Sequence, residues 1–138
     1  MKLEAWNMNY KSDRRITKIF GLSLDKIIKA VRSSIPPNKT IPEIGLVFVS
    51  PQKMRELNKK YRGKNKITNV LSFSEGDIVI CSEVVKKEAK KYGFTQKSWM
   101  TRLAVHGILH LIGYDHVRVR DRKNMEGLEK KILGRLGV

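Results

Sequence analysis

The three histidines of this chain all fall within one stretch of eleven residues, HGILHLIGYDH, which runs from His106 to His116. His106 and His110 are four residues apart, so on a helix their imidazoles project from one face and can reach the same ion. Gly113 can take a left-handed conformation that ends the helix and turns the chain, which lets His116 return to the same point. The spacing therefore predicts a helix that ends at a site where three imidazoles meet.

This spacing, H-x3-H-x2-G-x2-H, is that of the metzincin zinc site, where three neutral imidazoles bind the ion and leave one coordination position open. Without a metal, three buried imidazoles would leave donors and acceptors unpaired, at about 1–3 kcal/mol for each. We therefore expect one Zn²⁺ per chain, held by His106, His110 and His116, with zinc favoured over nickel or copper because this ligand set suits it. Asp115, beside a ligand, is expected either to accept a ring N–H or to serve the turn.

Gly107 stands where H-E-x-x-H enzymes carry the glutamate that acts as general base. Its absence argues against peptide hydrolysis, and so against a metallopeptidase. A structural zinc is the other alternative, but structural sites are usually closed by four protein ligands, often cysteines, and only three candidate ligands occur in this pattern. The pattern favours an open, catalytic metal site.

The charge balance of the chain indicates the kind of partner it binds. Its 29 lysines and arginines outnumber its 13 aspartates and glutamates, for a formal net charge of +16, far more than solubility requires. We expect a polyanion, and specifically a nucleic acid. The segment 53–66 contains a single acid, Glu56, and is the candidate for contacting phosphates. Its cations are Lys53, Arg55, Lys59, Lys60, Arg62, Lys64 and Lys66.

Hydrophobic periodicity predicts helices over residues 24–35, 51–61, 83–91, 96–112 and 119–135. Short apolar, β-branched runs predict strands over residues 2–10, 44–49, 70–74 and 77–81, of which the last two form a hairpin. The segment RGKNKITN, residues 62–69, is expected to be a loop. The expected N-caps are Ser23, Ser50, Ser82 and Thr95.

The length of 138 residues suits one domain with a single core. Mixed helices and strands with a central hairpin favour a single compact α+β domain over residues 1–138, in which a small mixed sheet packs against helices. Residues 96–112 are apolar almost all round and should form the buried central helix that binds the metal. No apolar run approaches the ~18 residues of a membrane span, and no secretory signal is recognisable. The single cysteine, Cys81, cannot form a disulfide within the chain, so we expect a cytoplasmic protein without membrane contact. Cys81 itself is expected to lie buried in a strand.

Several stretches of this sequence match one known family. HGILHLIGYDH matches the histidine motif of that family without substitution, and LNKKYRGKNKITNVLSF (57–73), GDIVIC (76–81) and the Met125 and Glu129 pattern match it as well. On these motifs the chain resembles the bacterial YbeY endoribonucleases, also described as ribosomal RNA maturation factors. The middle segment departs from the family's usual Asp, Pro and Asp at three positions, which are Asn65, Ile67 and Asn69.

The resemblance implies a single-domain α+β fold, zinc held by the three histidines, and a catalytic arginine at Arg62 that lines a positive cleft. It implies a cytoplasmic, single-strand-preferring endoribonuclease acting in maturation of the 3′ end of small-subunit ribosomal RNA and in ribosome quality control. The expected partners are ribosomal RNA and the small ribosomal subunit, with a ribosomal protein or an assembly GTPase as further partners. The alternative is a non-catalytic RNA-binding ribosome-assembly factor with a structural zinc.

A zinc ion held by three neutral imidazoles keeps its full double charge, which suits it to polarise a phosphoryl oxygen. RNA also carries its own nucleophile, the 2′-hydroxyl, so the missing carboxylate base is no obstacle with this substrate. Arg62 would hold the phosphate with a bidentate fork. Thr68 and Ser72 are expected to be structural rather than catalytic.

Overall fold

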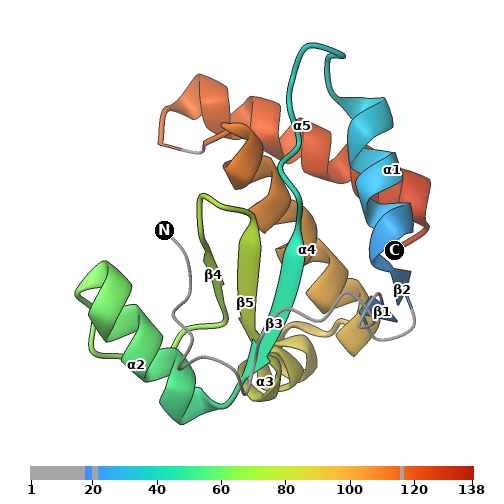
Figure 1. Ribbon diagram of the computed structural model, residues 1–138. Coiled ribbons are helices and arrows are strands. Elements are labelled where there is room, and N and C mark those ends of the chain that lie inside the picture. The colour runs from blue at the N-terminus through green and yellow to red at the C-terminus, as the bar shows by residue number, and fades with distance from the viewer. Residues whose placement is uncertain (1–17, 20–21, 116) are drawn as a thin grey trace.

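The computed structural model describes residues 18–19, 22–115 and 117–138 (Figure 1). In chain order their elements are β1 (Lys18–Ile19), β2 (Leu22–Ser23), α1 (Leu24–Ser34), β3 (Gly45–Val49), α2 (Pro51–Arg62), β4 (Val70–Ser72), β5 (Asp77–Cys81), α3 (Ser82–Tyr92), α4 (Gln96–Ile112) and α5 (Val119–Leu136). The predicted helices are all confirmed, and so are three of the predicted strands, to within two residues at either end. The fourth, residues 2–10, lies outside the described residues.

A three-stranded mixed sheet stands at the centre of the fold (Figure 1). Its strand order is β3-β5-β4, in which β3 runs parallel to β5 and β4 runs antiparallel to it. The predicted hairpin is therefore present, and it pairs Val70 with Ile80. Helices and a small mixed sheet in one unit confirm the expected α+β class.

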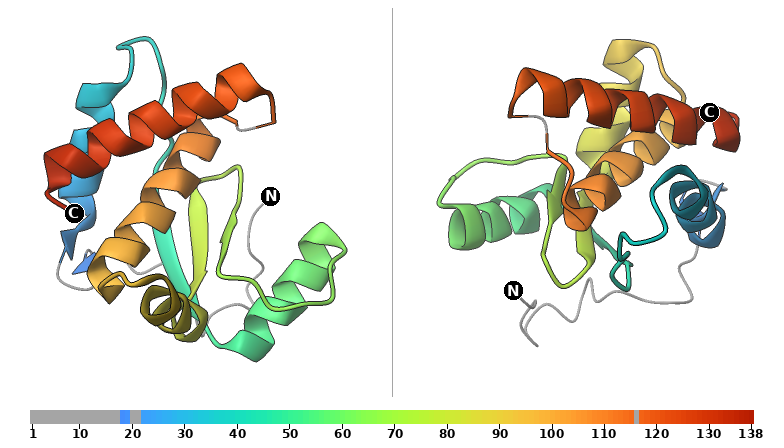
Figure 2. Two further views of the ribbon diagram at one scale, coloured as in Figure 1. Left: turned by 180° about the vertical axis from the view of Figure 1, so that it is seen from behind. Right: turned by 90° about the horizontal axis from the view of Figure 1, so that it is seen from above.

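The central strand β5 is apolar on both faces because helices cover the sheet from both sides. Ile78 and Ile80 lie in one hydrophobic cluster with residues of α1, α4 and α5, whereas Val79 and Cys81 lie in a second cluster with Met54 and Leu57 of α2. The thiol of Cys81 is completely buried, as expected for a structural strand residue. On the first face, α5 crosses the last turns of α4 (Figure 2).

The N-caps follow the sequence in two of four cases. The side chains of Ser50 and Thr95 accept the backbone N–H three residues later, at 3.2 and 3.0 Å. Ser23 occupies the N-cap position of α1 but makes no such bond. The prediction for Ser82 is wrong, since it is the first helical residue of α3 and Cys81 is the N-cap. Strand β5 runs directly into α3, so no loop residue remains between them to cap the helix.

Helix α4 has more buried residues than any other helix in the described part of the chain. Its buried residues cover several sides of the helix, as the sequence predicts, and are Met100, Thr101, Ala104, Val105, Gly107, Ile108 and Leu109. Within the described part of the chain no helix, α4 included, is both long and apolar enough to cross a membrane.

Candidate metal centre

A cleft of about 630 Å³ lies between α4 and β4, with the end of α2 at its rim. Its polar lining residues are Arg62, Asn69, Ser72, Ser74, His106 and His110. None of the described residues that line this cleft is acidic. An arginine and no carboxylate among these described lining residues suit an anionic ligand.

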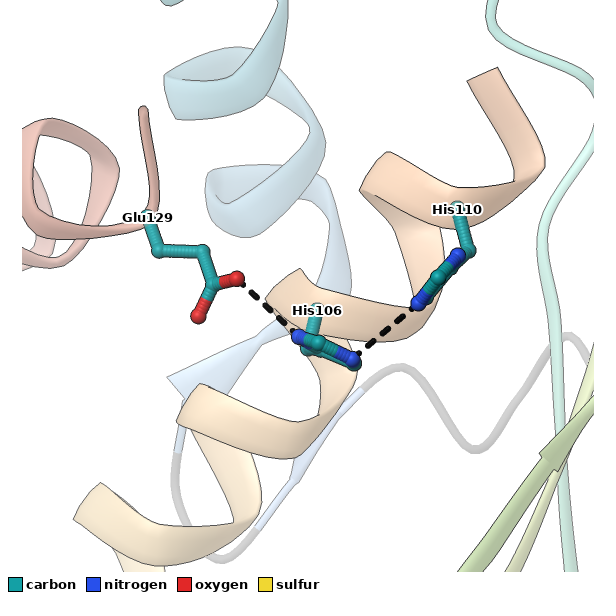
Figure 3. A network of polar contacts seen from close by, with 3 residues as sticks. All are labelled: His106, His110 and Glu129. Atoms are coloured by element: carbon teal, nitrogen blue, oxygen red, sulfur yellow. Dashed lines mark hydrogen bonds and ion pairs between the residues drawn. The ribbon is translucent and has the colours of Figure 1, made fainter. Parts of the chain in front are cut away.

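The two described histidines point toward each other at this cleft (Figure 3). The Nε2 atoms of His106 and His110 are 3.1 Å apart, and the ring planes are inclined at 75°. With Zn–N bonds of about 2.0–2.1 Å, two ligands of one tetrahedral ion are separated by about 3.3 Å. The spacing of this histidine pair therefore fits two ligands of a single divalent metal ion.

A carboxylate on α5 contacts His106 on the side of its ring that faces away from His110 (Figure 3). Oε1 of Glu129 lies 3.0 Å from Nδ1 of His106, and the two side chains are 23% and 40% exposed. An ionised carboxylate can only accept, so Nδ1 carries the proton and donates it, which leaves the Nε2 lone pair available to a metal. A carboxylate bound to the second ring nitrogen is a regular companion of metal-ligating histidines.

Sequence reasoning named Glu129 only as part of the family pattern and looked instead to Asp115 as the carboxylate partner. Asp115 is exposed, and its Oδ1 accepts the backbone N–H of Val117 at 3.1 Å, which is the turn role, the second of the two expected for it. A signal for Glu129 was present, because it follows the buried Met125 by one helical turn and so lies on the inward flank of α5.

The turn after α4 is formed as predicted. Gly113 has φ +116° and caps the helix, with its N–H donated to the carbonyl groups of its last turn. His116, the third predicted ligand, lies outside the described residues. Among the residues that the structure does describe, no group of three or more His, Cys, Asp or Glu side chains is close enough to hold a metal. The role of His116 as third ligand therefore stays a prediction.

Gly107, which stands where the H-E-x-x-H pattern has its glutamate, lies at a close contact between α4 and the sheet. A Cβ atom added to Gly107 would lie 2.9 Å from Oγ of Ser72 and 3.5 Å from Cδ1 of Ile78. The helix therefore touches β4 and β5 at this position through its backbone. A side chain here would require the Ser72 side chain or α4 to shift, so the close packing disfavours a carboxylate base at this point of the helix.

The predicted loop that starts at Arg62 begins one residue later, because Arg62 is the last residue of α2 and Gly63 caps it in a left-handed conformation. This places the guanidinium at the rim of the cleft. Its Nη2 donates to the carbonyl of Ser72 at 2.6 Å, and its carbon lies 5.3 Å from the ring centroid of Phe73. One arm of Arg62 is thus fixed on β4, which pre-orients a guanidinium that has five N–H donors in all.

The three residues that depart from the family pattern, Asn65, Ile67 and Asn69, lie in the segment after Arg62. Oδ1 of Asn65 accepts from Nε of Arg55 at 2.9 Å, and Ile67 is 46% exposed. Asn69 lines the cleft, and its Nδ2 donates to Oε1 of Glu88 at 3.0 Å. An aspartate cannot make this last bond because its ionised carboxylate has no donor. Ser72 lines the cleft, whereas Thr68 does not.

The fold and this site define a class: a small α+β protein whose positive cleft contains a histidine pair backed by a carboxylate, an arrangement typical of histidine-ligated metal hydrolases. A family model described as Endoribonuclease YbeY matches residues 7–137. The chain therefore belongs to the YbeY endoribonuclease family, a family of hydrolytic enzymes.

Individual relatives agree with this assignment. Endoribonuclease YbeY of Agrobacterium fabrum is 34% identical over the whole of this chain and 89% of its own length. The proteins of the same name from Buchnera aphidicola and Sinorhizobium fredii are 37% and 36% identical, over 91% and 88% of this chain and 83% and 77% of their own. The solution structure of TM1509 from Thermotoga maritima superposes with a TM-score of 0.56 at 25% identity, over 82% of this chain and 80% of its own.

Proposed function

We propose that this protein is a zinc-dependent endoribonuclease that prefers single-stranded RNA. The observation that carries the proposal is the convergence of His106 and His110, with Nε2 atoms 3.1 Å apart, at a cleft whose described lining includes Arg62 and no acid. An imidazole pair suits a zinc ion and an arginine suits a phosphate, so the cleft brings together side chains for a Lewis acid and for binding the scissile phosphate.

His106, His110 and His116 would hold the zinc, which when bound supplies a Lewis acid to the phosphoryl oxygens of the scissile bond. The protein's own contribution at this point is geometric. Glu129 accepts the hydrogen bond of the His106 Nδ1–H and so fixes the ring, with Nε2 facing the cleft. Gly107 keeps α4 against the sheet, which sets the histidines beside β4.

Arg62 would bind and orient the phosphate. Its guanidinium is held by the Ser72 carbonyl and by the ring of Phe73, so little side-chain freedom remains to be lost when a phosphate binds. The planar fork then meets two phosphate oxygens and stabilises the negative charge that develops on them. The substrate brings a 2′-hydroxyl, an internal nucleophile in a cleft whose described walls hold no carboxylate base. Attack of its oxygen on the adjacent phosphorus would form a 2′,3′-cyclic phosphate and break the bond to the 5′ oxygen, which leaves as a hydroxyl with the proton that the 2′-hydroxyl loses; water then opens the cyclic phosphate.

As the natural substrate we propose ribosomal RNA, in 3′-end maturation of the small-subunit RNA and in ribosome quality control, in the cytoplasm. The small ribosomal subunit, with a ribosomal protein or an assembly GTPase, would then supply specificity. The net charge of +16 supports a polyanionic partner of this kind. So does the basic segment 53–66, whose single acid, Glu56, is paired with Lys53 at 3.0 Å.

The test is cleavage of labelled RNA by zinc-loaded and chelator-treated protein, with a single strand and a fully paired duplex of the same sequence. We expect the zinc-loaded protein to cut the single strand, and the chelated protein and His110→Ala to be inactive. Lys29→Ala, which removes a charge from α1 away from the cleft, should be fully active. Tight RNA binding with no cleavage by zinc-loaded protein would refute the proposal and favour the non-catalytic assembly factor.

A further inference from the structure

A cluster of aromatic rings at the junction of α3 and α4 takes no part in the candidate metal centre. It consists of Tyr92, Phe94 and Trp99, with the guanidinium of Arg102, and we call these four residues the aromatic ledge. The rings of Phe94 and Trp99 stack with centroids 5.1 Å apart, and Tyr92 lies 5.2 Å from Trp99. Tyr92 is 52% exposed, so part of its ring is open to a ligand.

Arg102 is held in place without a carboxylate. Its guanidinium carbon lies 4.6 Å from the ring centroid of Phe94, and its Nε donates to Oγ of Ser98 at 3.3 Å. No acidic side chain among the described residues forms an ion pair with it. The ledge therefore presents a guanidinium whose charge is not neutralised and whose plane is already oriented by an aromatic ring.

The ledge lies on the same face of α4 as the histidine pair. Trp99, His106 and His110 are separated by seven and four residues, which places them in one stripe along the helix. Ser98, which fixes the Arg102 guanidinium, precedes His106 by eight residues, or about 12 Å at 1.5 Å per residue. This length equals about three to four phosphate spacings of a stacked strand, and fewer of an extended one.

A shared hydrogen-bond partner joins the ledge to the wall of the cleft. Oε1 of Glu88 accepts from Nε1 of Trp99 at 3.2 Å and from Nδ2 of Asn69 at 3.0 Å. Asn69 lines the cleft, and so does Leu103, one turn of α4 beyond Trp99. The cleft and the ledge are therefore adjoining parts of one surface whose relative position is fixed by side chains.

The chemistry of the ledge fits single-stranded RNA. Proteins bind single strands by combining cationic groups for the backbone with aromatic faces on which bases stack. Here Arg102 is the oriented cation and Tyr92 the exposed ring, and Nζ of Lys91 lies 5.5 Å from the centroid of that ring. The only acid in contact with the cluster, among the described residues, is Glu88, whose carboxylate already accepts two hydrogen bonds.

We propose that the aromatic ledge is an RNA subsite that binds the strand two to four nucleotides away from the scissile phosphate, with Arg102 on a backbone phosphate and Tyr92 under a base. This inference rests on the proposed function, because it assumes that the scissile phosphate lies at the histidine pair. It predicts that the ledge contributes to the binding of long strands and contributes nothing to very short ones.

The test compares a single strand of about 12 nucleotides with a dinucleotide, which has one phosphate and only one nucleotide on either side of it and so cannot reach the ledge. Tyr92→Ala and Arg102→Ala should each raise KM for the long strand about tenfold with kcat unchanged, and should leave cleavage of the dinucleotide unaltered. Tyr92→Phe keeps the ring and should behave as the unaltered protein. Lys29→Ala is the control for the loss of one positive charge, and should change KM less than twofold.

Binding of the long strand to zinc-free protein, followed by fluorescence anisotropy, separates the two proposals. If the protein cuts no RNA but Tyr92→Ala still weakens binding about tenfold, the proposed function fails, and the ledge is an RNA-binding surface without a neighbouring cleavage site. If both ledge variants bind and cut long RNA as the control does, or lose activity on both lengths equally, the cluster serves only to pack α3 against α4 and the inference is wrong. Thermal unfolding of every variant identifies a loss caused by misfolding, and Arg102→Lys then replaces Arg102→Ala in the comparison.

Discussion

The packing of α4 on the sheet can be tested by the same substitution, glycine to alanine, at Gly107 and at Gly127, whose surroundings differ. A glycine in a helix interior costs about 0.5–1 kcal/mol relative to alanine, so glycine-to-alanine changes on open helical surface stabilise a protein. Gly127 in α5 is such a position, since an added Cβ atom would meet nothing within 4 Å. At Gly107 the same Cβ atom would lie 2.9 Å from Oγ of Ser72, closer than van der Waals contact allows.

The expected energies have opposite signs. Overpacking costs about 1–3 kcal/mol, and the lower half of that range applies here because the Ser72 hydroxyl can rotate while Ile78 stays at ordinary contact distance. After the helix gain is subtracted, Gly107→Ala should lower the free energy of unfolding by about 1 kcal/mol. Gly127→Ala should raise it by about 0.5–1 kcal/mol. Urea unfolding followed by circular dichroism measures both.

A double-mutant cycle assigns the clash to one atom. Ser72→Ala removes Oγ, so Gly107→Ala in that background should recover most of the loss, with a coupling energy of about 1 kcal/mol. If Gly107→Ala alone stabilised the protein as much as Gly127→Ala does, α4 would not be in close contact with β4. Close packing would then not disfavour a carboxylate base at this position.

Four further predictions concern the metal, the phosphate and the protons. Glu129→Gln keeps the size of the side chain but loses its charge, and should weaken zinc binding about 10- to 100-fold in a chelator competition; unchanged affinity would mean that Glu129 does not act through His106. Arg62→Ala should keep its zinc and its melting temperature while losing RNA cleavage, Arg62→Lys should also be impaired because a point charge cannot replace the planar fork, and His110→Ala should lose both zinc and cleavage. Burial raises the pKa of the Asp77 carboxyl above its ordinary value of 3.8, so the folded protein holds that proton more tightly than the unfolded chain and loses the associated stability as pH rises. Asp77→Asn should therefore stabilise the protein more at about pH 7 than at about pH 3, and a gain independent of pH in urea unfolding would contradict this. RNA affinity should fall steeply with salt, and a flat titration would show that the basic surface is not the RNA site.

The elements of this fold were predictable because their signals are local. The apolar stripe of α1 ends at Pro36, the apolar β3 and β5 are short β-branched runs, and Glu75 and Gly76 lie between β4 and β5. Each of these signals involves residues a few positions apart, where backbone preferences and side-chain periodicity act directly. The N-cap of α3 escaped prediction for the same reason, since a strand that runs straight into a helix leaves no separate capping signal.

In the candidate site, too, the features that local sequence signals determine were predictable and the others were not. The pairing of His106 with His110 follows from their spacing on one helix, and the left-handed turn at Gly113 follows from its residue type, so the sequence by itself determined that two imidazoles converge. His116 as the third ligand remains a prediction. That Arg62 reaches the cleft was an expectation of the family resemblance and not of its position in the chain.

Only the tertiary structure decided what surrounds the histidines. Glu129 reaches His106 because α5 crosses α4, and Arg62 is fixed on β4 because α2 ends beside that strand. Gly107 lies against Ser72 for a similar reason, because α4 packs on the hairpin. These contacts join residues ten to thirty-five positions apart, and their geometry depends on how helices and strands cross. Crossing geometry is set by the packing of whole faces against a shared core, a property that no short window of sequence contains.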